Sequence, residues 1–134
     1  MTVRRLAAPA SALAAALLML AGPASASAAR VYHAGSCHAD GEYAVCVASG
    51  TAYDPTTIHI HVKSSHKGQH VYVAWSVVCV KGTGAGSRSG QYHATTVSNR
   101  KISHPYSRPD NCIVAATAQL NGGSYIRVWI TYYK

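Results

Sequence analysis

Apolar and polar residues alternate along most of the chain after residue 29. This period of two is expected of β-strands, whereas an amphipathic helix repeats every 3.6 residues. In the segment 57–63, for example, three β-branched apolar residues alternate with two histidines and a lysine. Each such segment can turn one face to a core and the other to solvent. The expected strands cover residues 43–49, 57–63, 70–80, 89–97, 111–120 and 124–133, with a further one at 30–34.

Clusters rich in Gly, Pro, Asn and Asp separate these segments and predict turns or loops. Residues 82–86 form one glycine-rich cluster, which we expect to be a flexible loop. The strongest hairpin signal is Asn121-Gly122-Gly123, because Asn-Gly readily takes the positive φ values of tight turns. Six or seven short strands at this spacing predict an all-β fold, a small antiparallel two-sheet sandwich of the immunoglobulin-like kind.

The N-terminal segment has the three parts of a secretory signal peptide. A basic pair and an apolar run precede the small residues at 24–28. The apolar run is broken by Pro9 and Pro23 and falls short of the roughly 20 residues that cross a bilayer, so we do not expect a membrane anchor. The expected organisation is a signal peptide at 1–28 and a secreted, extracellular β-sandwich domain at 29–134.

All four cysteines lie in the expected mature domain. An even number of cysteines in a small exported chain predicts two disulfides, for which three pairings are possible. We favour Cys37 with Cys46, which closes a short polar loop, and Cys79 with Cys112, which joins the end of one apolar strand to the start of another. In the chain-entropy model these crosslinks contribute roughly 2.5 and 3.5 kcal/mol.

The chain is basic, with 12 Lys plus Arg against 4 Asp plus Glu and a formal net charge of +8. The positive residues are spread over loops and strand edges, which favours nonspecific attraction to polyanions or serves only solubility. No nucleic-acid-binding motif accompanies the charge, so we expect no specific nucleic-acid partner. Eight histidines would make the surface more cationic below about pH 6.

The last expected strand carries the most informative candidate site. If Ile126, Val128 and Ile130 fill the core, the residues of opposite parity share the outer face. Aromatic and arginine side chains in one exposed row would form an apolar ribbon of the kind that supplies binding hot spots. The alternative is that the inward and outward residues are exchanged, or that another element covers the row, so that Trp129 is simply a core residue. The predicted partner-binding residues are Tyr125, Arg127, Trp129 and Tyr133, with Thr131 between them.

A metal site is a weaker candidate. His59 and His61 point the same way on one strand, with Cβ atoms roughly 7 Å apart, and a third ligand could come from His66, His70 or His93. Outward histidines are also ordinary solvated strand residues. Because the cysteines are expected to be oxidised and no His-x-x-x-His or Cys-x-x-Cys spacing occurs, we predict no metal and no cofactor.

Catalytic signatures are absent from the sequence. The acids Asp40, Glu42, Asp54 and Asp110 have no spacing that ties them to a histidine or to one another in a known catalytic pattern. The segment 86–90 resembles Gly-x-Ser-x-Gly but has Arg at the position of the nucleophile. We therefore expect a protein that is not an enzyme.

Two runs carry a family resemblance, Ala74-Trp75-Ser76-Val77-Val78-Cys79 and Asn111-Cys112-Ile113-Val114-Ala115-Ala116. Together with the export signal and four cysteines, they resemble small secreted two-disulfide β-sandwich proteins of high-GC filamentous bacteria. Within that group the chain is similar to the adaptor subunit of umbrella toxin particles, which joins a lectin subunit to the large toxin-bearing polypeptide. Secreted proteinase inhibitors are another similar class, and their reactive loop often lies beside a disulfide, as residues 103–111 would here.

These observations favour a non-enzymatic extracellular binding or adaptor module. It would recruit a protein or glycan through the face of its last strand, and the resemblance implies a place in a secreted toxin assembly. One alternative is a proteinase or hydrolase inhibitor that acts through the loop at 104–109. Another is an antimicrobial protein that binds cell-envelope polyanions or carbohydrate. The sequence does not determine the oligomeric state.

Overall fold

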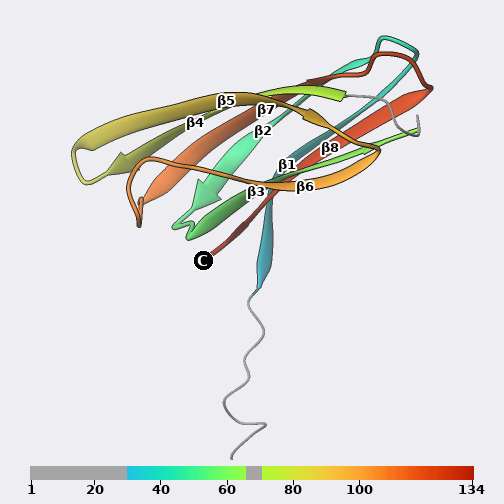
Figure 1. Cartoon of the computed structure of the whole chain (residues 1–134). Coiled ribbons are helices and arrows are strands. Elements are labelled where there is room, and N and C mark those ends of the chain that lie inside the picture. Colours follow the sequence, from blue (N-terminus) through green and yellow to red (C-terminus); the bar gives the residue numbers. More distant parts are fainter. Residues whose placement is uncertain (1–29, 66–70) are drawn as a thin grey trace, which may run out of the picture.

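The computed structural model describes residues 30–65 and 71–134, so the predicted signal peptide lies outside the described residues. Within them the chain forms eight strands and no helix, and hence no helix that could span a membrane. The strands are β1 (Val31–Asp40), β2 (Val45–Tyr53), β3 (Thr57–Ser64), β4 (Val71–Lys81), β5 (Gly84–Ala94), β6 (Val97–Ile102), β7 (Asn111–Gln119) and β8 (Tyr125–Tyr133) (Figure 1).

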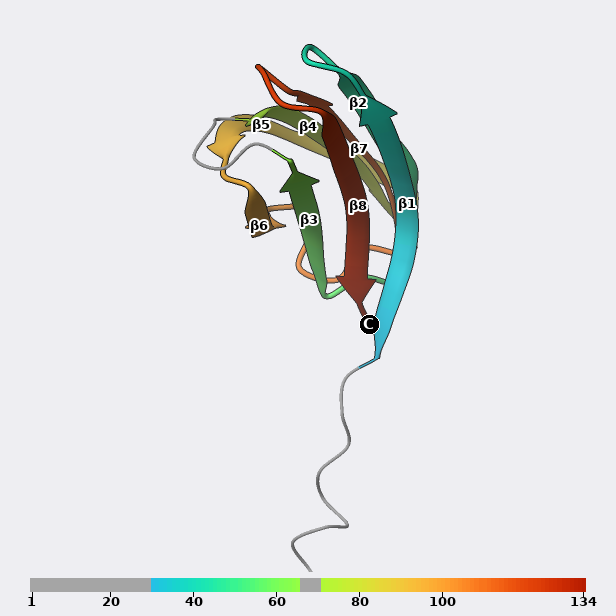
Figure 2. The ribbon, with the colours of Figure 1, turned by 90° about the vertical axis from the view of Figure 1, so that its right-hand side faces the viewer.

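The strands build two antiparallel four-stranded sheets, with orders β1-β8-β3-β6 and β2-β7-β4-β5. The sheets lie face to face in Figure 1, and the turned view of Figure 2 looks onto the first of them. The predicted all-β, two-sheet antiparallel sandwich is confirmed. Two details differ, because the strands number eight rather than six or seven, and their interleaved order is that of a jelly roll rather than an immunoglobulin domain.

The segment predicted as one strand at 89–97 is the end of β5 and the start of β6. Residues 84–88 extend β5 by pairing along β4, although the glycine-rich cluster 82–86 is expected to be a flexible loop. They lack apolar alternation because two are glycine and two are serine or alanine, so their strand character comes from the neighbouring backbone. The first strand, expected at 30–34, continues to Asp40.

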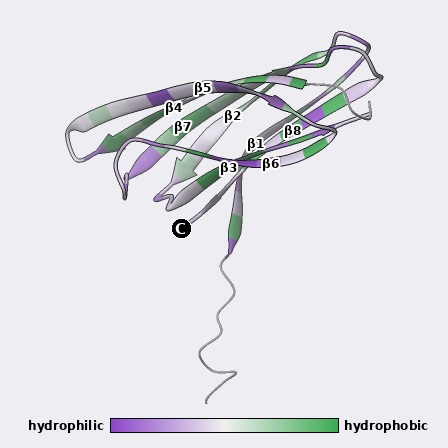
Figure 3. Ribbon diagram, viewed as in Figure 1, coloured by the Kyte–Doolittle hydropathy of each residue, from purple (hydrophilic) through white to green (hydrophobic). Residues whose placement is uncertain are grey.

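The core lies between the sheets and is built from alternate residues of each strand. Green and purple bands follow one another along the strands in Figure 3, as alternation requires. The parity assumed for the last strand is correct, because its three inward side chains have no exposed surface. The fully buried core residues of the two central strands of the first sheet are Ile58, Ile60, Val62, Ile126, Val128 and Ile130.

Both disulfides have the favoured pairing. Cys37 of β1 is bonded to Cys46 of β2, which ties one sheet to the other. Cys79 of β4 is bonded to Cys112 of β7, and these two residues are direct partners in the second sheet. The crosslinks therefore stabilise two different contacts, one between the sheets and one within a sheet.

Backbone contact between β1 and β2 closes one side of the sandwich. A Cβ added at Gly35 would lie 2.0 Å from the carbonyl oxygen of Ser49, and one added at Gly50 would lie 1.7 Å from that of Ala34. Only glycine permits so close an approach. A β-bulge between His33 and Gly35 bends β1 at the same point.

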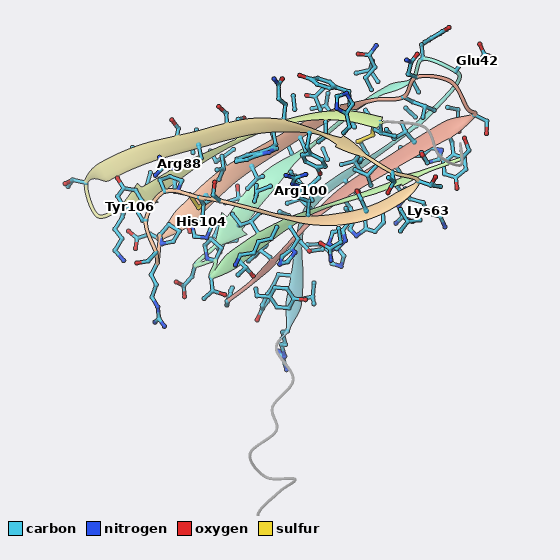
Figure 4. All side chains as sticks on the ribbon, in the orientation of Figure 1. Glu42, Lys63, Arg88, Arg100, His104 and Tyr106 are labelled. Carbon is cyan, nitrogen blue, oxygen red and sulfur yellow. A yellow bond between two sulfur atoms is a disulfide. The ribbon has the colours of Figure 1, made fainter. Side chains whose placement is uncertain are left out.

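The opposite side of the sandwich ends at the edge strands β5 and β6, and both carry an inward-facing arginine. Arg88 is paired with the buried Val77 and Arg100 with the buried Ile60, so each arginine shares the inner face of its sheet (Figure 4). The guanidinium carbon of Arg100 lies 4.5 Å from the ring centroid of Tyr92. Inward-pointing charges on edge strands oppose the addition of a further strand.

Candidate partner-binding face

The predicted binding row lies on the central part of an exposed sheet face. β8 is flanked by β1 and β3, and its outward residues alternate with the buried core residues. Arg127 is exposed, Tyr125, Trp129 and Tyr133 are partly buried, and Thr131 is buried. The four predicted residues therefore share one surface. We call the outer side of the sheet β1-β8-β3-β6 the β8 face.

Histidines of β3 stand beside this row. The register pairs His59 with Thr131, His61 with Trp129 and Lys63 with Arg127. From the sequence these histidines are separate metal candidates, because the pairing of β3 with β8 is not visible in the pattern of either segment. Their alternation correctly indicates that they are outward, and the register adds them to the β8 face.

Trp129 is held by two neighbours. Its ring is stacked on the imidazole of His61, with 5.0 Å between the centroids and 4° between the planes. The guanidinium carbon of Arg127 lies 5.1 Å from the indole centroid, within the range of a cation–π contact. His61 Nε2 is in turn hydrogen bonded to Thr131 Oγ1 at 2.7 Å. These contacts hold the indole in one orientation.

Two further ring pairs hold the outer aromatic residues of the row. Tyr133 makes an edge-to-face contact with His59, with 5.7 Å between the centroids. Tyr125 is stacked on His38 of β1, with 6.0 Å between the centroids. His38 Nε2 also lies 3.0 Å from Asp40 Oδ1. Each aromatic residue of the row is thus paired with a histidine from a neighbouring strand.

Burial and two nearby histidines reduce the basicity of His61 at the middle of the face. Partial burial lowers the pKa of His61 below its ordinary value of 6.5, and the nearby His59 and His33 lower it further. His61 is therefore neutral at pH 7. A neutral imidazole can keep the hydrogen bond to Thr131 and remain flat against the indole without a desolvated charge.

The fixed charge of the β8 face is mainly positive. Arg127 and Lys63 are direct neighbours, and Lys101 on β6 is paired with the outward residue at position 59. Among the described outward residues of these four strands, Asp40 is the single acid. The face therefore combines aromatic area with a net positive potential.

His93, one of the third ligands considered for a metal site, does not join His59 and His61. His66 and His70 lie outside the described residues, and His93 is on β5 of the other sheet. In the part of the chain that the structure describes, no group of three or more His, Cys, Asp or Glu side chains could hold a metal ion.

The loop considered for an inhibitor is fastened to the body of the domain. Pro105 and Pro109 are buried, and Tyr106 has a φ of 68°. The ring of His104 is within hydrogen-bonding distance of the carbonyl oxygens of Tyr106 (3.0 Å) and Thr56 (3.1 Å). A substrate-like loop needs extended backbone, whereas a residue at this φ is in the left-handed region. Figure 4 marks His104 and Tyr106 near the turn that joins β4 to β5.

The four acids are divided between the two ends of the sandwich. Asp40 and Glu42 lie where β1 ends and the turn to β2 begins, whereas Asp54 and Asp110 lie beyond the other end of β2. Figure 4 marks Glu42 at the first of these two ends. The Asp110 carboxylate accepts a hydrogen bond of 2.8 Å from the backbone N–H of Gly82, so it fastens the β4–β5 turn.

Comparisons with known proteins place the chain in no family. No family model and no curated protein matches it. Among solved structures, TmCBM61 in complex with beta-1,4-galactotriose has a TM-score of 0.44 and 15% identity, covering 79% of this chain and 69% of that chain. PirA has a TM-score of 0.39 and 9% identity, covering 82% of this chain and 98% of that chain. At this level of similarity neither structure indicates what the chain binds.

Proposed function

We propose that this protein is a non-enzymatic, extracellular binding or adaptor module that recruits a partner through the β8 face. The observation that carries the proposal is the row of Tyr125, Arg127, Trp129 and Tyr133 on one exposed face, with each aromatic ring already fixed by a histidine. Aromatic and arginine side chains provide most hot-spot energy. Side chains held before binding lose less entropy when the partner arrives.

A protein partner suits this geometry better than a glycan does. A sugar ring stacks on a free aromatic face, but the indole of Trp129 is already in contact with His61 and Arg127. The ring edges and the exposed guanidinium remain available, and these suit the packed, hydrogen-bonded centre of a protein interface. Inhibition of the interaction by free oligosaccharide would favour the glycan alternative.

Extracellular action is consistent with the two disulfides, because such bonds persist in oxidising compartments. The resemblance to adaptor subunits of umbrella toxin particles supports a finer proposal, in which the partner is a component of a secreted toxin assembly. The net positive face favours a partner that presents acidic residues around an apolar centre.

The test is capture of partners from the producer's own culture supernatant by the tagged protein, read by mass spectrometry. A double change, Tyr125→Ala with Trp129→Ala, should weaken binding about 30-fold, which corresponds to the roughly 2 kcal/mol of a hot spot. Matched control variants are Tyr43→Ala in the exposed β1–β2 turn and Tyr106→Ala in the fastened loop. Both should bind like the unchanged protein.

Three outcomes would contradict the proposal. The first is equal capture by the double variant, and the second is loss of binding only in Tyr106→Ala, which would favour the inhibitor. The third is a fall of the melting temperature of Trp129→Ala by more than about 10 °C, since roughly 2 kcal/mol would then be structural. In that case the row mainly stabilises the sheet.

A further inference from the structure

The outer face of the second sheet, β2-β7-β4-β5, has no formally charged residue. Each strand contributes five outward positions, and the register aligns them in five rows across the sheet. We call this surface the β7 face. Its residues are Val45, Val47, Ser49, Thr51, Tyr53, Asn111, Ile113, Ala115, Thr117, Gln119, Tyr72, Ala74, Ser76, Val78, Val80, Ala85, Ser87, Ser89, Gln91 and His93.

Many of these side chains are large, apolar and exposed. Ile113 on the central strand β7 is 63% exposed, and Val78, its direct partner on β4, is 47% exposed. The other large hydrophobic residues of the face with more than a third of their surface exposed are Val45, Val47, Tyr53, Tyr72 and Val80. Exposed large apolar side chains gathered on one sheet face mark an interaction site.

Charge is confined to the rim of the face. Lys81 and Asp110 lie at the strand ends, beyond the outermost row. A chain with a formal net charge of +8 therefore keeps a whole sheet face free of charge, while the β8 face on the other side carries several cations. A charge-depleted centre within a polar rim is the usual anatomy of a protein interface.

The size of the face matches half of a stable dimer interface. Four strands spaced at about 4.8 Å span about 19 Å, and five rows at about 6.7 Å span about 33 Å, which is roughly 600 Å² for each copy. Two copies would bury about 1,200 Å², at the lower end of the range for specific complexes.

We propose that the β7 face binds the β7 face of a second copy of this chain. Two sheets pack face to face at about 10 Å when their strands are nearly aligned. The central row, Ser49-Ala115-Ser76-Ser89, has only small side chains and so permits this approach. A two-fold axis along the row closes the assembly as a dimer.

In the two rows next to the axis, large side chains on β4 and β7 face smaller ones of the other copy. Val78 lies one row to one side of the axis and Ala74 one row to the other, so Val78 of each copy packs on Ala74 of the other copy. In the same way Ile113 packs on Thr117. Each copy supplies both partners of each contact, as an isologous interface requires.

A second copy also suits the electrostatics. Two copies of so basic a chain repel each other wherever charged surfaces meet, and the β7 face is the sheet surface on which they can meet without opposing charges. The dimer leaves both β8 faces outward, on opposite sides. If the β8 face binds a partner, the dimer is bivalent and gains avidity for a repeating or oligomeric target. Dimerisation itself does not depend on that proposed function.

The test is sedimentation equilibrium of the purified disulfide-bonded protein between about 1 and 500 μM, a range set by the affinity expected of so small an interface. We expect a reversible dimer that persists in 1 M NaCl. The change Ile113→Lys should raise the dissociation constant of the dimer by at least tenfold. Val97→Lys is the matched control, because Val97 is 68% exposed on the β8 face, and it should dimerise normally.

Crosslinking tests the position of the axis. With Ala115→Cys, a short bis-maleimide should join two copies covalently, whereas Val97→Cys should dimerise but give no covalently joined pair under the same treatment. A monomer at every concentration would overturn the proposal, even if another protein then covers the β7 face. Equal weakening by both lysine variants, or undiminished dimerisation of Ile113→Lys, would overturn it as well.

Discussion

Replacing Gly50 with alanine should separate the two sheets at their closed side. The new Cβ would lie 1.7 Å from the carbonyl oxygen of Ala34, whereas Cβ atoms are essentially never found closer than 3.0 Å to another heavy atom. The backbone of β1 must therefore retreat by at least 1.3 Å, which is 3.0 minus 1.7. The disulfide between Cys37 and Cys46 restrains this retreat, because it ties the same two strands together.

The expected loss of folding free energy in Gly50→Ala follows from what the new Cβ meets, which is the backbone carbonyl of Ala34. Overpacking a core typically costs about 1 to 3 kcal/mol, and the upper end applies here because the obstacle is backbone that cannot change rotamer. Alanine gains back at most about 1 kcal/mol through the lower entropy of the unfolded chain. The net loss is about 2 kcal/mol, or about 8 to 16 °C in melting temperature for a domain of this size.

Thermal unfolding followed by circular dichroism measures this effect. Ser49→Ala is the matched control, since Ser49 precedes Gly50 on β2 and points outward, and it should melt within about 2 °C of the unchanged protein. A fall of less than about 3 °C in the melting temperature of Gly50→Ala corresponds to well under 1 kcal/mol. That result would show that β1 and β2 are not in backbone contact, and it would refute the description of this side of the sandwich as closed.

Two further predictions concern the pH response and the crosslinks. The pKa of His61 in the folded state is below its ordinary value, so the free energy of unfolding should fall as pH drops through about 6.5. In a pH series of urea melts, His61→Gln should show a smaller fall. Replacing Cys37 and Cys46 with serine should cost about 2.5 kcal/mol, and replacing Cys79 and Cys112 about 3.5 kcal/mol, by the chain-entropy argument. A larger loss on removal of the Cys37–Cys46 bond than of the Cys79–Cys112 bond, in the same urea melts, would contradict the dependence of the stabilisation on the length of the closed loop.

Local pattern was sufficient for the strands that alternate strictly. β3, β4, β7 and β8 all lie within two residues of the expected segments, because inward and outward side chains alternate along an extended backbone whatever its neighbours are. The start of β5 was missed for the opposite reason. Its residues Gly84 and Gly86 have no side chain to alternate. They become strand only because Gly84 pairs with Lys81 and Gly86 pairs with Cys79 on β4.

The candidate site was predicted in part. Parity placed Trp129 and its row on one outer face, and the structure agrees. The contribution of His61 was not predicted in this role, because its position beside Trp129 depends on the register of β3 against β8. The β7 face was missed altogether, since its residues come from four separate segments and none of these segments is unusual in isolation.

Sequence alone therefore determined the strand periodicity, the inward or outward direction of each alternating residue and the favoured pairing of the four cysteines. These are local properties, set by backbone geometry and by the number and spacing of cysteines. Tertiary structure decided the order of the strands, and with it which outward residues become neighbours, as with His61 and Trp129. Many strand orders satisfy the same alternation, and only packing of the whole chain, including the backbone contact at Gly50, selects one of them.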